Sequence, residues 1–130
     1  MKHASAKIIN ILQDESSYNE QSGTFVFQLS EEVDDEWKNI FASLIGDGYN
    51  SFYAKPRPTF KRNDAISALA NIEGEGDIPT TTTELQHLIR ATNVSYNEMV
   101  DERVKKDKEN KKKKLDLDNK VKQIIGKLDL

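Results

Sequence analysis

The fold is decided by residues 23–45, GTFVFQLSEEVDDEWKNIFASLI, where the spacing of apolar side chains changes from every second residue to every third or fourth. The first part, Gly23–Ser30, alternates Phe25, Phe27 and Leu29 with less apolar neighbours. An alternation of period two is typical of a strand with one buried face. We therefore predict a strand here, followed directly by a helix.

The helix is predicted from the acidic stretch that follows this strand. Ser30 or Asp34 is expected to cap its free N–H groups, and the neighbouring acids stabilise the positive end of a helix. Gly46 and Gly48 are expected to end it. Its apolar stripe consists of Trp37, Ile40, Phe41, Leu44 and Ile45.

Three other segments have the residue pattern of strands. Ala6–Leu12 fits either a strand or one face of a helix, and its β-branched isoleucines favour the strand. Pro56 and Pro58 make the next extended segment an edge strand or irregular until Thr59, because proline cannot donate to a ladder. Ala65–Ile72 alternates with small side chains, as expected of a strand that a helix covers closely.

A second helix is predicted to begin at a capping box formed by Thr81 and Glu84. Neither proline nor glycine interrupts the chain between this box and Gly126, and residues 105–114 contain no apolar side chain. The apolar stripe of this helix consists of Leu85, Leu88, Ile89, Thr92, Tyr96, Met99, Val100 and Val104.

Together these segments predict an α+β fold, with a four-stranded, mainly antiparallel sheet and two helices in the order β-β-α-β-β-α. We expect residues 1–104 to form the domain and residues 105–130 to form a lysine-rich helical extension with a short amphipathic end. The expected core consists of Phe25, Phe27, Leu29, Trp37, Ile40, Phe41, Leu44, Ile66, Ala68, Leu85, Leu88, Ile89 and Tyr96.

Charge is distributed unevenly along the chain of 130 residues. The net charge is −3, yet residues 1–100 carry 8 Lys or Arg and 15 Asp or Glu, whereas residues 101–130 carry 11 and 7. Such asymmetry marks either an interaction tail or a solvated lysine-rich helix. There is no cysteine, no long apolar stretch near Met1 and no apolar run of membrane-spanning length. We therefore expect a cytoplasmic protein without disulfides, a secretory signal or a membrane span.

The sequence contains no motif of a catalytic, metal or cofactor site. His3 and His87 are far apart, and neither a nucleophile elbow nor a phosphate-binding glycine loop is present. Glu73, Glu75 and Asp77 alternate in a glycine-rich stretch but lack the spacing of a calcium loop. We therefore expect that the protein is not an enzyme and binds neither a metal nor a cofactor. An active site would have to be assembled from acidic residues scattered along the chain.

The aromatic–basic loop, residues 49–62 (YNSFYAKPRPTFKR), is one candidate binding surface. Basic side chains attract phosphate and aromatic rings stack on bases, so this composition suits single-stranded nucleic acid. A protein contact and a purely structural role, with the aromatics capping the sheet, also fit. Its candidate residues are Tyr49, Phe52, Tyr53, Lys55, Arg57, Lys61 and Arg62.

The lysine run, residues 103–114 (RVKKDKENKKKK), is a second candidate, with eight positive and two negative side chains. It would bind nucleic acid or an acidic partner, or simply form a solvated helix. It holds only one arginine, the residue better suited to bidentate phosphate contacts. Its lysine knot consists of Lys111, Lys112, Lys113 and Lys114.

The C-terminal seam is the third candidate and consists of Leu117, Val121, Ile124 and Leu128, spaced by 4, 3 and 4 residues. Two heptads are too short for a stable coiled coil alone. The seam therefore either docks on a partner or a second copy, or packs back on its own domain.

These patterns favour a non-catalytic protein-interaction or assembly module that self-associates or binds a protein partner through the C-terminal seam. The alternative is a nucleic-acid-binding accessory protein that uses the aromatic–basic loop and the lysine run. Salt distinguishes the two, because phosphate contacts weaken steeply as salt rises and an apolar seam resists it. No small-molecule substrate is evident.

Overall fold

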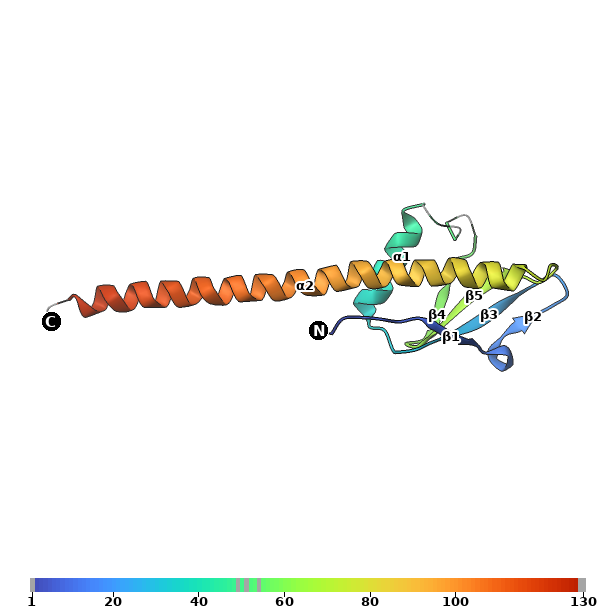
Figure 1. Cartoon of the computed structure of the whole chain (residues 1–130), viewed down its shortest axis with the longest axis horizontal. Coiled ribbons are helices and arrows are strands. Elements are labelled where there is room, and N and C mark those ends of the chain that lie inside the picture. Colours follow the sequence, from blue (N-terminus) through green and yellow to red (C-terminus); the bar gives the residue numbers. More distant parts are fainter. Residues whose placement is uncertain (1, 49, 51, 54, 129–130) are drawn as a thin grey trace. The chain divides into compact units, whose positions relative to one another are not determined.

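The computed structural model describes residues 2–48, 50, 52–53 and 55–128, and these form an α+β fold (Figure 1). The predicted fold class and order of elements are confirmed, and a two-residue strand and a short 3-10 turn are added to them. The elements are β1 (Ile8–Ile11), the 3-10 turn η1 (Gln13–Glu15), β2 (Ser17–Tyr18), β3 (Ser22–Leu29), α1 (Asp35–Gly46), β4 (Thr59–Arg62), β5 (Ala65–Asn71) and α2 (Asp77–Gly126).

The strands form one antiparallel sheet with the order β1-β3-β5-β4, and β2 pairs with β3 as well. The central pair β3–β5 sets Phe25 opposite Ala68 and Phe27 opposite Ile66. Large residues therefore face small or branched ones across the ladder, which leaves room for helices above this face. The central strands β3 and β5 are the longest of the described strands, and both lie in segments whose alternation predicted a strand.

The stretch with two readings, Ala6–Leu12, forms a strand at Ile8–Ile11. Its register to β3 shifts between Ile8 and Asn10, the position of a β-bulge. A bulge adds one residue to the strand, so the apolar residues on either side of it are not spaced by two. This spacing explains why the segment also fitted one face of a helix. The β-branched isoleucines gave the correct preference.

Both helices cover the face of the sheet that carries Phe27 and Ile66. In Figure 1 the yellow half of α2 lies over the strands, and two hydrogen bonds link it to α1. Trp37 Nε1–H donates to Asn93 Oδ1 at 2.9 Å, and the Tyr96 hydroxyl donates to Asp34 Oδ2 at 2.6 Å. The largest fully buried side chains include Trp37, Phe27, Phe41, Leu29, Ile45, Ile66, Leu85 and Ile89. Full burial of each such side chain contributes about 1.5–3 kcal/mol, so this face supplies most of the stability.

The opposite face of the sheet is partly covered as well. Val26 is buried there although it lies in the polar half of the β3 alternation. Its N–H donates to Ser16 Oγ at 3.0 Å, and its carbonyl accepts from Leu12 N–H at 2.8 Å. The turn η1, with the residues that flank it, therefore closes over the middle of β3.

Helix α1 begins where the acids predicted. Asp34 is the cap, since its Oδ1 accepts from Trp37 N–H at 2.9 Å, whereas Ser30 Oγ accepts from Lys7 N–H at 3.1 Å and belongs to the sheet edge. The expectation that Ile40 and Leu44 are core residues is wrong, because both are only half-buried. The side chains that turn inward are Trp37, Phe41 and Ile45, and the first two meet Phe60 of β4 edge-on.

Helix α2 begins four residues before the predicted capping box, at Asp77. Pro79 lies in its first turn, where a missing N–H costs nothing and the fixed φ suits a helix. Asp77 Oδ2 accepts from Gly74 N–H at 2.9 Å at this end. Thr81 is buried inside the helix and Glu84 half-buried, so neither of them serves as the predicted cap.

Three amide side chains of α2 hold the N-terminal segment. Asn97 accepts from Ala4 N–H at 2.6 Å and donates to Ala4 O at 2.9 Å. Asn93 Nδ2–H donates to Ala6 O at 2.8 Å, and Gln86 Oε1 accepts from Ile8 N–H at 2.8 Å. An amide both donates and accepts, so this row satisfies the backbone of an extended segment as a neighbouring strand would.

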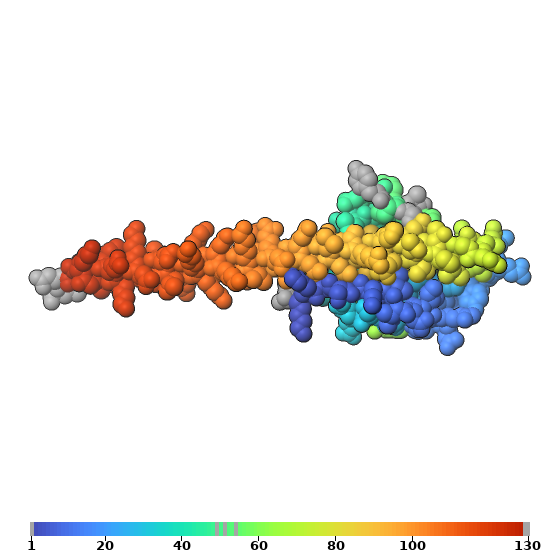
Figure 2. Space-filling model, viewed as in Figure 1, coloured from blue at the N-terminus to red at the C-terminus, as the bar shows by residue number. Residues whose placement is uncertain are grey.

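The structure divides into a compact unit, Lys2–Asn97, and a second unit that contains Glu98 and the residues beyond it. Every described residue from Asp101 to Leu128 is exposed (orange to red in Figure 2). Across the described part of the chain, no helix combines the length and the apolar character needed to cross a bilayer. The domain boundary expected at residue 104 stays a prediction.

Candidate interaction surfaces

The C-terminal seam is exposed along its whole length. Leu117, Val121, Ile124 and Leu128 are 59%, 46%, 54% and 56% exposed. The first three lie in α2, and at 100° per residue they share a sector of about 60° on the helix surface. Leu128 follows the end of the helix in a turn, where its N–H donates to Ile125 O at 3.1 Å.

The seam is wider than the sequence spacing suggested. Ile125 is 58% exposed and lies next to Val121 on the helix surface, about 40° further round. Lys113 and Lys120 lie along the other border of the seam, one heptad apart. This apolar strip with a lysine border is typical of a helix face that pairs with another apolar surface.

The aromatic–basic loop is divided between interior and solvent. Phe52 is 2% exposed and therefore presents no ring to a base, whereas Tyr53 is 57% exposed. Lys55 and Arg57 are exposed beside it. Tyr49 lies outside the described residues.

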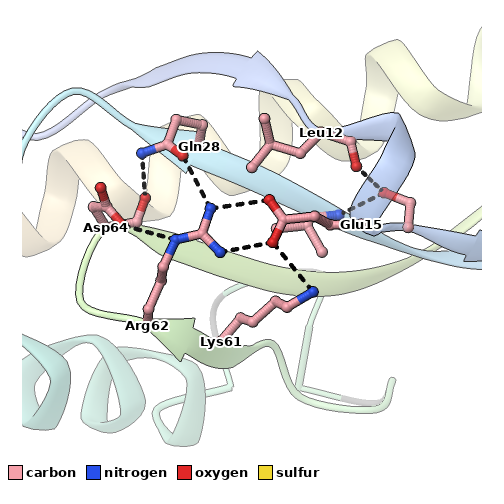
Figure 3. Close-up of polar contacts among 8 residues, drawn as sticks. Leu12, Glu15, Gln28, Lys61, Arg62 and Asp64 are labelled. Carbon is pink, nitrogen blue, oxygen red and sulfur yellow. Dashed lines mark hydrogen bonds and ion pairs between the residues drawn. The ribbon is translucent and has the colours of Figure 1, made fainter.

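Lys61 and Arg62 of the same loop belong to an ion-pair cluster with Glu15 (Figure 3). Arg62 Nη1–H and Nη2–H donate to the two oxygens of Glu15 at 2.7 and 3.0 Å, and Lys61 Nζ lies 3.3 Å from Oε1. Arg62 Nε–H also donates to Asp64 Oδ1 at 3.2 Å. The two cations are thus already engaged within the fold.

The cluster shifts the ionisation of both partners. The hydrogen bond from Arg62 is the largest cause that lowers the pKa of Glu15 from 4.5 to about 2; desolvation opposes it, and the hydrogen bond from Lys61 adds a smaller lowering. The pKa of Arg62 is raised, chiefly by the same hydrogen bond. A carboxylate held ionised in this way is neither a proton donor nor a base near neutral pH. The cluster therefore ties η1 to the edge strand β4.

Two acidic side chains, Asp34 and Asp77, have local structural contacts. Asp34 caps α1 and accepts from Tyr96, and Asp77 accepts from Gly74. Among the residues that the structure describes, no three His, Asp or Glu side chains lie close enough together to hold a metal ion.

A groove between α1 and α2 is a surface that the sequence did not predict. It has a volume of about 530 Å³, and Leu44, Leu88 and Ala91 supply its apolar lining. Asp47 and Glu84 add two carboxylates, and Asn50 closes the end of α1 by donating to Leu44 O at 2.9 Å. We name these residues, together with His87, the α1–α2 groove.

The groove lies near the end of α1, away from the two hydrogen bonds that link the start of this helix to α2. The hydrogen bonds of Trp37 and Asp34 to α2 lie at the start of α1, whereas Leu44 and Asp47 lie at its end. The half-buried Leu44, which the pattern assigned to the core, lines this groove. The one signal in the sequence is the spacing of Glu84, Leu88 and Ala91 on one helical face.

Neither the protein-family models, nor the curated proteins, nor the solved structures with which the chain was compared contain a match. Function is therefore inferred from the geometry of the chain itself.

Proposed function

We propose that this protein is a non-catalytic interaction module that associates with a second copy or another protein through the C-terminal seam. The observation that carries the proposal is the exposure of four large apolar side chains, each between 46% and 59%, in one strip at the end of the chain. Single exposed apolar residues are ordinary, but a continuous strip is typical of a binding surface.

The strength of the association follows from the area. Completing the burial of a half-exposed leucine or isoleucine contributes about 1 kcal/mol, or roughly 4 kcal/mol for the seam. Loss of translational and rotational freedom offsets part of this gain, so the seam alone supports only a weak complex, with a dissociation constant of about 1 mM or above. The seam therefore needs a complementary surface on the partner rather than a flat one.

The test places two charges in the seam. Val121→Asp with Ile124→Asp disrupts the strip, and the matched control, Asn119→Asp with Gln123→Asp, places the same charges on the opposite side of the helix. Light scattering coupled to size exclusion, over about 10 µM to 1 mM so that the upper end reaches this affinity range, gives the mass relative to one chain of 14.8 kDa. We expect association that persists in high salt, is lost in the seam variant and is kept in the control.

The result that would contradict the proposal is equally specific. A seam variant with the same mass and the same binding partners as the unaltered protein, at every concentration, excludes the seam as the binding surface. Circular dichroism shows whether both variants keep their helix. The four positions are exposed, so we expect both to fold.

Nucleic-acid binding is the second candidate, supported by the exposure of Lys111, Lys112, Lys113 and Lys114. The aromatic–basic loop adds less to it, since Phe52 is buried and Glu15 engages Lys61 and Arg62. Replacing the four lysines of the knot by glutamine tests it, with a fluorescent single-stranded oligonucleotide as probe. Binding that falls steeply with salt and is lost in this variant favours the candidate, and unchanged binding excludes the knot.

A further inference from the structure

We infer that the C-terminal seam of one copy docks into the α1–α2 groove of a second copy. This docking rests on the proposed function, which does not specify the surface that the seam binds. Each copy would then contribute its seam at one contact and its groove at another.

The groove has the chemistry that the seam requires. Leu44 and Ala91 present apolar surface above the buried Leu88, and Asp47 and Glu84 lie beside it. The seam presents leucine, valine and isoleucine with lysines along its border. Apolar surface therefore meets apolar surface, and the lysine border meets carboxylates.

The dimensions of the two surfaces agree as well. Glu84 to Ala91 and Leu117 to Ile124 are both seven residues of helix, or about 10 Å. Two turns of a docked helix thus lie along two turns of α2. The groove volume of about 530 Å³ is open space into which apolar side chains of a second helix fit.

The opposite net charges of the two units also favour this contact. Residues 2–97, which contain the whole groove, carry 8 Lys or Arg and 14 Asp or Glu, whereas residues 98–130 carry 11 and 8. Opposite net charges steer the two surfaces of different copies together.

Pairing of two seams is the less favourable arrangement. In an antiparallel pair the lysine borders of the two copies lie side by side and repel each other. In a parallel pair Lys114, three residues before Leu117, occupies the preceding core position and faces Lys114 of the other copy. Docking of the seam in the groove of its own chain is the other arrangement, and it predicts a monomer at every concentration.

A seam and a groove at different positions make a heterologous contact. Such a contact closes into a ring or continues as a chain of copies, and a chain or a ring of three or more copies has a mass above that of a dimer. This behaviour distinguishes the arrangement from a pair of seams, which is self-limiting.

The experiment uses two full-length variants that each lose one half of the contact. Asp47→Lys with Glu84→Lys reverses the groove charges and keeps the seam, and Val121→Asp with Ile124→Asp disrupts the seam and keeps the groove. Glu20→Lys with Glu32→Lys is the control for a change of net charge at exposed positions elsewhere. Sedimentation velocity over a concentration series measures the mass of each variant.

We expect each of the first two variants to associate at least tenfold more weakly than the unaltered chain, and the control to associate normally. A further variant that combines Asp47→Lys and Glu84→Lys with Lys113→Glu and Lys120→Glu in the seam border should regain association, because the charges are exchanged on both sides. Circular dichroism and thermal melting verify that all variants fold.

Two outcomes overturn the inference. If the groove variant associates as the unaltered chain does while the seam variant does not, the seam binds another surface, so the groove is excluded and the proposed function stands. If the unaltered chain is a monomer over the whole series, docking between copies is excluded. The proposed function then depends on a different protein whose binding the seam variant abolishes.

Discussion

Glu15 accepts two hydrogen bonds from Arg62, at 2.7 and 3.0 Å, across 47 positions of sequence. The pair joins the turn η1 to the edge strand β4, while Lys61 and Asp64 extend it on either side. It also explains why two basic residues of the aromatic–basic loop contribute less to a phosphate-binding surface than their composition suggests.

The Glu15 pair predicts a pH-dependent contribution to stability. Since the pKa of Glu15 falls from 4.5 to about 2 on folding, its contribution is present above pH 4.5 and is lost as the pH falls toward 2. Glu15→Gln should therefore lower the urea midpoint at pH 7 slightly, and the difference from the unaltered protein should vanish near pH 2. Because the pair is exposed, high salt should reduce the effect. Glu20→Gln is the control, and a difference that stays constant from pH 7 to pH 2 would contradict the assignment.

Replacing Asn93 is expected to lower the free energy of unfolding more, because this side chain is hydrogen-bonded to two buried partners. Its Oδ1 accepts from Trp37 Nε1–H and its Nδ2–H donates to Ala6 O. Asn93→Ala leaves both partners unsatisfied, which should cost about 2–4 kcal/mol in the free energy of unfolding. The neighbouring Val94→Ala, at a side chain 59% exposed, should change it by less than about 0.5 kcal/mol. Equal effects of the two substitutions in urea denaturation would refute this role of Asn93.

Gly23 predicts a steric effect at the junction of β2 and β3. A Cβ atom at this position would overlap with Tyr18 Cβ and lie 2.8 Å from Ser17 O, and the backbone does not yield easily. Gly23→Ala should therefore destabilise the protein by about 1–3 kcal/mol. Gly46→Ala, at the end of α1, meets no atom within 4 Å and should be neutral or stabilising, by up to about 1 kcal/mol. Thermal melting of the two variants gives the comparison, and a Gly23→Ala protein as stable as the parent would rule out the clash.

The parts of the fold that local patterns determine were predictable. The alternation of Phe25, Phe27 and Leu29 identified β3, and the acids before Trp37 identified the start of α1, because both signals lie within a few residues of their effect. The start of α2 was misplaced because Thr81 and Glu84 were interpreted as a capping box, whereas the helix begins at Asp77 and has Pro79 in its first turn, where proline is favourable.

What could not be predicted depends on pairs far apart in the chain. Asn97 and Ala4, or Arg62 and Glu15, meet only once the sheet and helices are assembled, and nothing in their spacing indicates it. The half-burial of Leu44 has the same origin, since this side chain lines a groove whose other wall, with Glu84, Leu88 and Ala91, comes from α2. The seam was predictable because it depends on one helix alone. The α1–α2 groove was not, because two helices form it.

The last prediction concerns the local stability of α2. Its buried turns, with Leu85, Ile89 and Thr92, are held by the core, whereas every described residue from Asp101 onward is exposed. Helices without packing are marginal in water, so amide hydrogens from Asp101 to Gly126 should exchange orders of magnitude faster than those near Ile89 in a dilute sample. On raising the concentration, protection should increase around Val121 and Ile124 and around the end of α1, and the lysine run should stay fast. Mass spectrometry of exchanged peptides resolves these segments. Slow, concentration-independent exchange along the whole of α2 would show that no association is needed to stabilise the seam, and protection confined to the seam would place its partner outside the α1–α2 groove.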